Sequence, residues 1–486
     1  MSIAAGYEFT AMVTEEGKLW VVGDGDRGSL GTAQTGLHTM PTRVHVSMEC
    51  GRFVREEAVS MVASSAMHVM CVTRKGALYA WGCNESGQLG YTLPDAVYRP
   101  ELVARHIHGD SDVVMVTCGF QHSIVLTAAA RVFTCGRGSS GQLGHGSQQN
   151  ERSLTCLSME LFGTSRIGMV ACGSRHSVAL AVCGGLYMWG NNSRGELGTD
   201  DRDMRLVPTK LADGSCSDEQ GVFVAAGGSN TIVVTVQGGL WACGNGLRGR
   251  LGLDTTEDRL VLTRVGGGGG ADGGGVGLVF GGGDVLMASC GYRHTLVVTK
   301  KGSVWAYGEG LFGGLGQEDF KYRTTPAPVD RVYFDHQCIV CVHTGPRHSV
   351  AVTENGKLYM WGDRKAIGQN RHPPTRQLAT PVLTSFFQDA RVGEYHNIPL
   401  SHALAFAMKT HARLGKRGCA VARKSRRQKG KTPGRSEYQV GFFDIPSELV
   451  KLIIAACVSC PQRVPRGSTG IIRLMGGGMI EHGDAS

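Results

Sequence analysis

Short apolar or alternating runs of roughly four to seven residues, each closed by a glycine-containing turn, follow one another along most of the chain. One example places such runs at 98–103, 113–119, 122–127 and 131–136. This pattern predicts short β-strands rather than helices. Composition agrees, since the 486 residues include 72 Gly and 15 Pro with 42% hydrophobic residues. We therefore predict an all-β chain.

Strand-ending glycines mark an internal repeat of about 54 residues. The steps between them are 59, 54, 54, 54, 64 and 54 residues, for Gly23, Gly82, Gly136, Gly190, Gly244, Gly308 and Gly362. Fourteen residues before the glycine, five units carry a histidine: His68, His122, His176, His294 and His348. The other two units carry Phe9 and Asn230 there. Because the histidine recurs in five of the seven units and is replaced in the other two, we expect it to be a structural hydrogen-bonding residue rather than a catalytic one.

Aromatic residues precede the same glycines. All six tryptophans lie three or one residues before a repeat glycine, at Trp20, Trp81, Trp189, Trp241, Trp305 and Trp361. Large aromatic side chains at one fixed position of a strand are typical of a core. We expect Trp81, Trp189 and Trp361 to be structural.

The stretch GRGSSG at 136–141 matches the G-x-G-x-x-G pattern of dinucleotide-binding loops. A polar loop follows it, instead of the helix and acidic residue that a cofactor site needs. We therefore interpret the pattern as a turn made once per unit and predict no cofactor. The third position holds Gly or Asn in six units, which predicts a left-handed backbone there: Gly25, Asn84, Gly138, Asn192, Gly246 and Gly310.

About four strands per unit and seven units predict a closed seven-bladed β-propeller over 1–408. The stretches CGFQHSIVLTAAARVFTCGRGSSGQLGHG (118–146) and CGSRHSVALAVCGGLYMWGNNSRGELGTD (172–200) resemble repeats of the regulator of chromosome condensation family. That resemblance covers about 1–405 and implies the same seven-bladed fold. A half-unit around His402 is interpreted as a closing strand near the N-terminal unit, with an imperfect eighth blade as the alternative. A glycine-rich insertion at 266–283 is expected to be a flexible surface loop.

Arginines in equivalent positions are the candidate partner-binding residues. One set directly precedes the repeat histidine, at Arg175, Arg293 and Arg347. A second set lies in the glycine turns, at Arg27, Arg194 and Arg248. Equivalent positions in a propeller share a face, so each set is expected on one face around the axis. The two interpretations are a site for an acidic partner and ordinary solvated charge.

No nucleophile elbow, P-loop or catalytic triad is evident, which favours a non-enzymatic protein-interaction scaffold. The resemblance also implies an alternative, guanine-nucleotide exchange on a Ran-type small GTPase. Family members with that activity use an inserted wedge, whereas units two to five here keep a step of 54 residues. C-x-x-C pairs at 338–341 and 457–460 have zinc-like spacing, but alternating strand faces separate the first pair, and no metal site is predicted.

The positive charge of the chain, +9 in total, is concentrated in one segment. Residues 409–435 hold eleven Lys or Arg and no Asp or Glu, which predicts a disordered basic linker over 409–440. Its functions stay open between a nuclear-import signal, a sequence-independent nucleic-acid contact and a solubilising linker. The residues concerned are Lys416, Arg417, Arg423, Lys424, Arg426, Arg427, Lys429 and Lys431.

The segment 441–460 predicts a short amphipathic helix, and 461–486 a disordered tail. IPSELVKLI (445–453) weakly resembles the opening of an F-box, which implies a second alternative, a ubiquitin-ligase substrate adaptor. The N-terminus lacks a basic, apolar leader, and no apolar stretch reaches the roughly 18 residues of a bilayer span. We expect an intracellular protein, in the nucleus, the cytoplasm or both, with no membrane partner.

Overall fold

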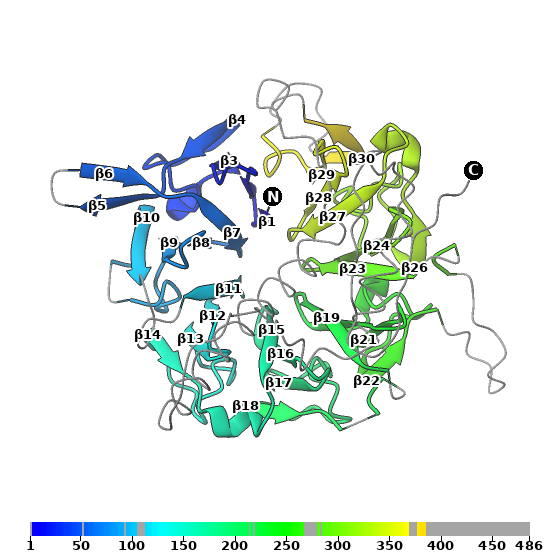
Figure 1. Cartoon of the computed structure of the whole chain (residues 1–486). Coiled ribbons are helices and arrows are strands. Elements are labelled where there is room, and N and C mark those ends of the chain that lie inside the picture. The colour runs from blue at the N-terminus through cyan, green and yellow to red at the C-terminus, as the bar shows by residue number, and fades with distance from the viewer. Residues whose placement is uncertain are drawn as a thin grey trace, which may run out of the picture.

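A computed structural model of the chain shows seven four-stranded antiparallel sheets arranged in a ring (Figure 1). The all-β, seven-bladed propeller predicted from the repeat is confirmed. The structure describes residues 2–384, except for 51–52, 92–93, 105–111, 213, 217–218, 267–278, 282–283 and 369–376. Most of the glycine-rich insertion and everything predicted beyond residue 384, including the strand at His402, the basic linker and the amphipathic helix, lies outside the described residues.

Within every blade the strands pair in chain order. Blade 1 contains β1 (Ser2–Ala5), β2 (Phe9–Val13), β3 (Leu19–Asp24) and β4 (Leu37–Val44). Blade 2 contains β7 (Val59–Ser64), β8 (His68–Thr73), β9 (Leu78–Cys83) and β10 (Ala96–Ala104). Blade 3 contains β11 (Val113–Cys118), β12 (His122–Thr127), β13 (Val132–Gly136) and β14 (Glu151–Cys156). Blade 4 contains β15 (Ile167–Cys172), β16 (His176–Ala181), β17 (Leu186–Gly190) and β18 (Arg205–Lys210).

The remaining blades follow the same order. Blade 5 contains β19 (Gly221–Ala226), β20 (Asn230–Thr235), β21 (Leu240–Gly244) and β22 (Arg259–Arg264). Blade 6 contains β23 (Val285–Cys290), β24 (His294–Thr299), β25 (Val304–Gly308) and β26 (Arg323–Pro328). Blade 7 contains β27 (Ile339–Thr344), β28 (His348–Thr353), β29 (Leu358–Asp363) and β30 (Gln377–Leu383). The 3₁₀ turns are η1 (Asp26–Gly28), η2 (Met159–Phe162), η3 (Leu247–Gly249) and η4 (Arg331–Phe334).

The boundary between units differs from the sequence-based grouping by one strand. That grouping placed 98–103 at the start of a unit, whereas this segment forms β10 and pairs with β9, with Leu102 opposite Tyr79. It is therefore the outer strand of blade 2. A periodic sequence gives the spacing of strands but not the strand with which a blade begins, because that depends on which strands exchange backbone hydrogen bonds.

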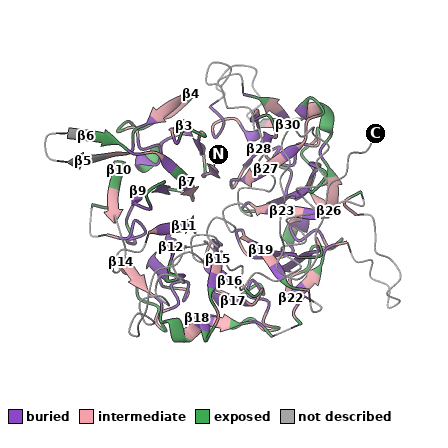
Figure 2. Ribbon diagram, viewed as in Figure 1, coloured by how far each residue is buried: buried purple, intermediate pink, exposed green. Residues whose placement is uncertain are grey.

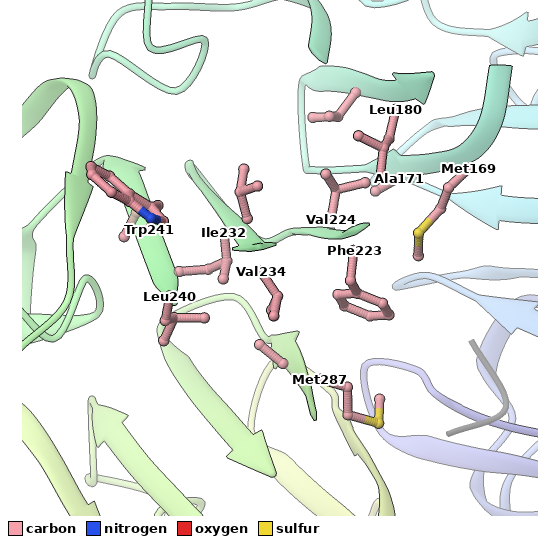
Figure 3. Close-up of a cluster of buried hydrophobic side chains, with 14 of the residues drawn as sticks. Met169, Ala171, Leu180, Phe223, Val224, Ile232, Val234, Leu240, Trp241 and Met287 are labelled. Carbon is pink, nitrogen blue, oxygen red and sulfur yellow. The ribbon is translucent and has the colours of Figure 1, made fainter. Parts of the chain in front are cut away.

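The core lies between the blades. The second strand of each blade is buried along its length, as in β12 and β20, whereas outer strands such as β14 are partly exposed (Figure 2). Figure 3 shows Phe223 and Ile232 of blade 5 packed between Leu180 of blade 4 and Met287 of blade 6. Each sheet thus has both faces covered by its neighbours, which explains why its second strand can be apolar on both sides.

The ring closes without a strand shared between its two ends. Residues 2–44 supply all four strands of blade 1, and residues 339–383 supply all four of blade 7. Side chains join these blades, since Thr10 Oγ1 lies 2.9 Å from His348 Nε2 and donates to the Ala366 carbonyl oxygen at 3.2 Å. We call this junction the seam.

A two-stranded hairpin, β5 (Ser47–Cys50) and β6 (Phe53–Glu56), projects from the ring between blades 1 and 2 (Figure 1). It accounts for the 59-residue step in the repeat. Arg43 forms two hydrogen bonds to the Glu56 carboxylate at its base, at 2.7 and 2.8 Å. No helix within the described residues is long and apolar enough to cross a membrane.

Candidate protein-interaction face

Strand direction defines two faces of the ring. Because the four strands of a blade are antiparallel and sequential, the loop between the first and second strands and the turn after the third strand reach the same side. We call this side the loop face. The tight turns between the second and third strands and the crossovers between blades lie on the opposite side, the hairpin face.

Glycine turns on the loop face pack against the next blade. A Cβ on Gly141, where φ is +71°, would lie 2.8 Å from the Arg205 carbonyl oxygen of blade 4. The GRGSSG stretch continues into two successive turns, with Gly141 N donating to Gly138 O and Gly144 N to Gly141 O. Residues of blade 4, including Arg205 and Leu206, occupy the space next to this turn.

One expectation about these turns was wrong. The position shared by Gly138 and Asn192 does not have a left-handed backbone in any of the six units; Gly246, for example, has a φ of −90°. Glycine is needed there because the returning loop comes close, and a Cβ on Gly138 would lie 1.8 Å from the Gln149 carbonyl oxygen. Where Asn192 takes this place, its Oδ1 accepts a hydrogen bond from Leu197 N at 2.9 Å and its Nδ2 donates to Asp201 O.

The repeat histidines lie at the junctions between blades. Each places Nε2 next to a hydroxyl 2.8–3.1 Å away in the following blade. The pairs are His68–Ser123, His122–Ser177, His176–Thr231, His294–Ser349 and His348–Thr10. Each hydroxyl donates its own proton to a carbonyl oxygen in the turn of the preceding blade, as Ser177 does to Gln142 O at 2.7 Å. Since the hydroxyl proton is used, the imidazole donates from Nε2.

These histidines are neutral. Burial lowers the pKa of His68, His122 and His348 to about 3, and that of His176 and His294 to about 4. Three tryptophans also bond across junctions, with Nε1 donating to a turn carbonyl of the preceding blade at 2.8–2.9 Å: Trp81, Trp189 and Trp361. The histidine and tryptophan positions therefore join blades and do not face an open site.

Two junctions lack the histidine. At the blade 1/2 junction Phe9 stands opposite Val69, so donor and acceptor are both replaced by buried apolar side chains. At the blade 5/6 junction Asn230 stands opposite Thr295, which keeps its hydroxyl. Asn230 is buried and forms a hydrogen bond with the Cys290 thiol, in place of the bond across the junction that the histidine makes elsewhere.

All six candidate arginines lie on the loop face, and five of them are paired with carboxylates. Arg27 pairs with Glu85 and Arg194 with Asp258 of the next blade. Arg248 and Arg293 share Glu309. Arg175 is exposed and forms no ion pair with any residue in the described part of the chain. The arginine sets therefore do not form a continuous unpaired positive surface.

Arg347 lies at the point where blades 6, 7 and 1 meet. Its guanidinium stacks over Phe312 of blade 6 at 4.6 Å and over Tyr7 of blade 1 at 4.9 Å. Glu8 of blade 1 lies 3.9 Å from its Nη1. Through these contacts Arg347 stabilises the seam, although part of its side chain remains exposed.

Arg250 is a loop-face residue that the sequence analysis did not single out. Only 5% of it is exposed, and it donates to the Leu247 and Tyr292 carbonyl oxygens at 3.0 and 3.1 Å. Burial, with the nearby charge of Arg293, lowers its pKa to about 10, so it stays charged at neutral pH. The sequence did contain a signal, because the equivalent position holds uncharged or acidic residues elsewhere: Ser29, Gln88, Gln142, Glu196 and Gly314.

Large apolar side chains are also exposed on the loop face. Nine of them lie in its loops and turns: Tyr7, Met67, Phe120, Met204, Leu247, Tyr292, Leu311, Phe320 and Tyr322. In the crossovers and tight turns of the hairpin face, Met159 and Val332 are the exposed large apolar residues within the described ranges. The sequence analysis missed this difference, because exposure of a loop residue depends on its neighbouring blades.

No group of three or more potential metal ligands is present among the described residues. Cys341 lies in β27, whereas Cys338 precedes that strand and accepts a hydrogen bond from Arg331 Nη2 at 3.4 Å. The second C-x-x-C pair at 457–460 and the basic residues proposed for import or polyanion contact, Lys416 to Lys431, lie outside the described residues.

Comparisons with known proteins agree with the repeat. Residues 1–272 match the model of the RCC1-like domain, and residues 288–313 and 339–363 match regulator of chromosome condensation (RCC1) repeats. The chain is 31% identical over 369 residues to the ultraviolet-B receptor UVR8 of Arabidopsis thaliana, covering 74% of this chain and 78% of the receptor. It is 29% identical over 398 residues to the human E3 ubiquitin-protein ligase HERC2, covering 80% of this chain but 8% of the ligase.

Solved structures show the same architecture. Human WBSCR16 aligns with a TM-score of 0.62 at 25% identity, covering 72% of this chain and 85% of WBSCR16. Prp20p from Saccharomyces cerevisiae, described with its binding to Gsp1p and histones, aligns with a TM-score of 0.62 at 20% identity, covering 77% and 87%. At that identity the second likeness concerns the fold.

Proposed function

Because the chain belongs to the family of RCC1-like propellers, we propose that it is a non-enzymatic scaffold whose loop face binds a protein partner. The observation that carries this proposal is the difference between the faces. Exposed tyrosine, phenylalanine, methionine and leucine side chains gather on the loop face beside arginines, a combination that is enriched at protein–protein interfaces. Loops on a rigid scaffold are also where binding residues concentrate.

Proximity labelling tests this proposal. The full chain, fused to a biotin ligase, is compared with a loop-face variant carrying Tyr7→Ser, Phe120→Ser and Tyr292→Ser. A matched hairpin-face variant carries Met159→Ser and Val332→Ser. We expect the loop-face variant to lose partners that the wild type and the hairpin-face variant both label. Identical partner sets for all three proteins would contradict the proposal.

Nucleotide exchange on a Ran-type GTPase is a second candidate, supported by the inserted hairpin β5–β6. The test measures the rate of nucleotide release from a purified Ran-type GTPase with and without the full chain. Acceleration by orders of magnitude would favour exchange activity over the scaffold proposal. Yeast Prp20p, which is described as binding Gsp1p, provides the precedent.

The ubiquitin-ligase adaptor alternative depends on 441–460, and the proposed nuclear import depends on 409–435. Failure of the full chain to pull down the ligase scaffold protein would remove the first. An unchanged distribution between nucleus and cytoplasm after deletion of 409–435 would remove the second.

A further inference from the structure

The blade 5/6 junction departs from the bonding pattern of the ring. Asn230 is 1% exposed and bonds the Cys290 thiol, whereas the Thr295 hydroxyl across the junction donates to the Arg250 carbonyl oxygen at 3.1 Å. A position that departs from the bonding pattern of its own repeat is expected to be functional or strained.

Positive charge accumulates on the loop face directly at this junction. Arg248 and Arg293 share the single carboxylate of Glu309, and the buried Arg250 lies close enough to both arginines to interact with their charge. The nearby Asp258 is already within 3.4 Å of both Arg194 and Arg202. The cluster therefore has fewer carboxylates than guanidinium groups, and an added carboxylate would be attracted to it.

Exposed apolar side chains lie close in the chain to the same arginines and to Glu309. Leu247, Tyr292 and Leu311 are 54%, 46% and 50% exposed. The Arg293 guanidinium lies 5.5 Å from the centre of the Tyr292 ring. Tyrosine and arginine side by side, flanked by aliphatic groups, are typical of the centre of a protein interface. We call Leu247, Arg248, Arg250, Tyr292, Arg293 and Leu311 the blade 5/6 patch.

We propose that the blade 5/6 patch is the docking point for an extended protein segment in which acidic side chains alternate with large apolar ones. The carboxylates of such a segment pair with Arg248 and Arg293, with the buried charge of Arg250 behind them, and its apolar side chains cover Leu247 and Leu311. Two of the three apolar residues are leucines, which offer no ring on which a nucleic-acid base can stack, so a protein segment fits better than a single strand. This inference rests on the proposed function and assigns it a place and a chemistry.

Selection of displayed peptides tests the chemistry. The purified full chain is used to select from a random library of 12-residue peptides on phage, and the most enriched peptide is synthesised with a fluorescent label. We expect it to contain Asp or Glu together with Leu, Phe or Tyr. Enrichment of basic peptides, or no enrichment over a column without protein, would overturn the proposal.

Fluorescence anisotropy with the selected peptide tests the place. Arg293→Gln and Tyr292→Ser are each expected to weaken binding about tenfold, which corresponds to a lost contact of about 1.4 kcal/mol. Arg175→Gln and Phe120→Ser change the equivalent positions of blades 4 and 3 and serve as matched controls that leave binding unchanged. Leu247→Ser tests the apolar part of the patch without removing a charge.

Equal losses in the patch variants and their controls would show a diffuse charge effect and overturn the assignment to blades 5 and 6. Binding of a labelled 12-residue poly-glutamate or oligo-thymidine as tight as that of the selected peptide would overturn the mixed acidic and apolar chemistry. Either result leaves the broader loop-face proposal to the labelling experiment, whose variants extend over blades 1, 3 and 6.

Discussion

At the scale of single residues, five of the seven blade junctions contain a short chain of hydrogen bonds that crosses the junction twice. His176 of blade 4 donates to Thr231 of blade 5, and Thr231 donates back to the Glu196 carbonyl oxygen of blade 4. Neutral hydrogen bonds contribute about 0.5–1.5 kcal/mol each, while an orphaned partner costs more. The Phe9–Val69 pair shows how the protein itself replaces both partners together.

This pairing predicts non-additive mutations. His176→Phe alone leaves the Thr231 hydroxyl without its donor, and Thr231→Val alone leaves His176 Nε2 without an acceptor. We expect each to lower the free energy of unfolding by about 1–3 kcal/mol. The double variant should lose less than the sum of the two. Urea denaturation of the four proteins measures the coupling, and full additivity would contradict a direct bond.

The neutral histidines predict a dependence of stability on pH. Their pKa is lowered by burial to about 3–4 in the folded protein, against about 6.5 when unfolded, so the unfolded chain binds more protons below pH 6.5. Their contribution is present above pH 6.5 and is lost as the pH falls towards 4. The loss is about 1.4 kcal/mol per pH unit for each histidine. Urea denaturation at pH 7.5 and 5.5 should show it, and His176→Asn should reduce the slope by one histidine's share.

The histidines could be located from sequence because their distance from the glycine never changes, but their partners could not. The signal was visible, since a Ser or Thr directly follows His122, His176, His294 and His348. A residue adjacent in sequence points to the opposite side of a strand, so its bond is made to the neighbouring blade 55 positions away. Only the packing of two blades shows that these two positions meet.

At the scale of elements, the glycine turn after the third strand determines how closely two blades approach. Gly141 combines a positive φ with a Cβ direction that points at the backbone of β18. Gly146 in the same loop has a similar φ of +79°, but its Cβ would have only an ordinary contact, 3.8 Å from Val207. Both glycines therefore have a left-handed backbone, but only Gly141 also lacks room for a Cβ atom.

We expect Gly141→Ala to be clearly more destabilising than Gly146→Ala. The second change costs about 1–2 kcal/mol for the left-handed backbone alone, and the first adds the collision with Arg205. Thermal unfolding of both variants gives the comparison. Equal shifts in midpoint would show that blade packing does not constrain this turn.

The sequence predicted the turn itself but assigned one requirement to the wrong position. Gly and Asn both tolerate a left-handed backbone. At Gly138 and Asn192, however, each residue accommodates the returning loop in its own way. Glycine permits close approach of the returning loop, and asparagine replaces that approach with side-chain hydrogen bonds. Residue identity alone does not distinguish these two causes, whereas the φ angles do.

At the scale of the whole molecule, the seam differs from the other six junctions because its two blades, formed by residues 2–44 and 339–383, are not consecutive in the chain. Hydrogen bonds through Thr10 and contacts around Arg347 join it instead. Ser177 makes the same two kinds of bond at the blade 3/4 junction, where the chain also crosses over. Comparison of the two positions isolates the effect of chain connection.

Thr10→Val should therefore open the ring locally, whereas Ser177→Ala should not. Hydrogen exchange is the measurement. We expect faster exchange in β1, β2 and β28 of the Thr10 variant, and little change in β12 and β16 of the Ser177 variant. Equal effects at both positions would indicate that the seam is held by more than these side chains.

The central claim is that partners bind the loop face, and cross-linking with mass spectrometry tests it most directly. Lys321 and Lys365 lie in loops of the loop face. Lys75, Lys301 and Lys357 lie in tight turns of the hairpin face. In complexes captured with the full chain, the account predicts partner cross-links to Lys321 and Lys365. Cross-links confined to Lys75, Lys301 and Lys357 would contradict it.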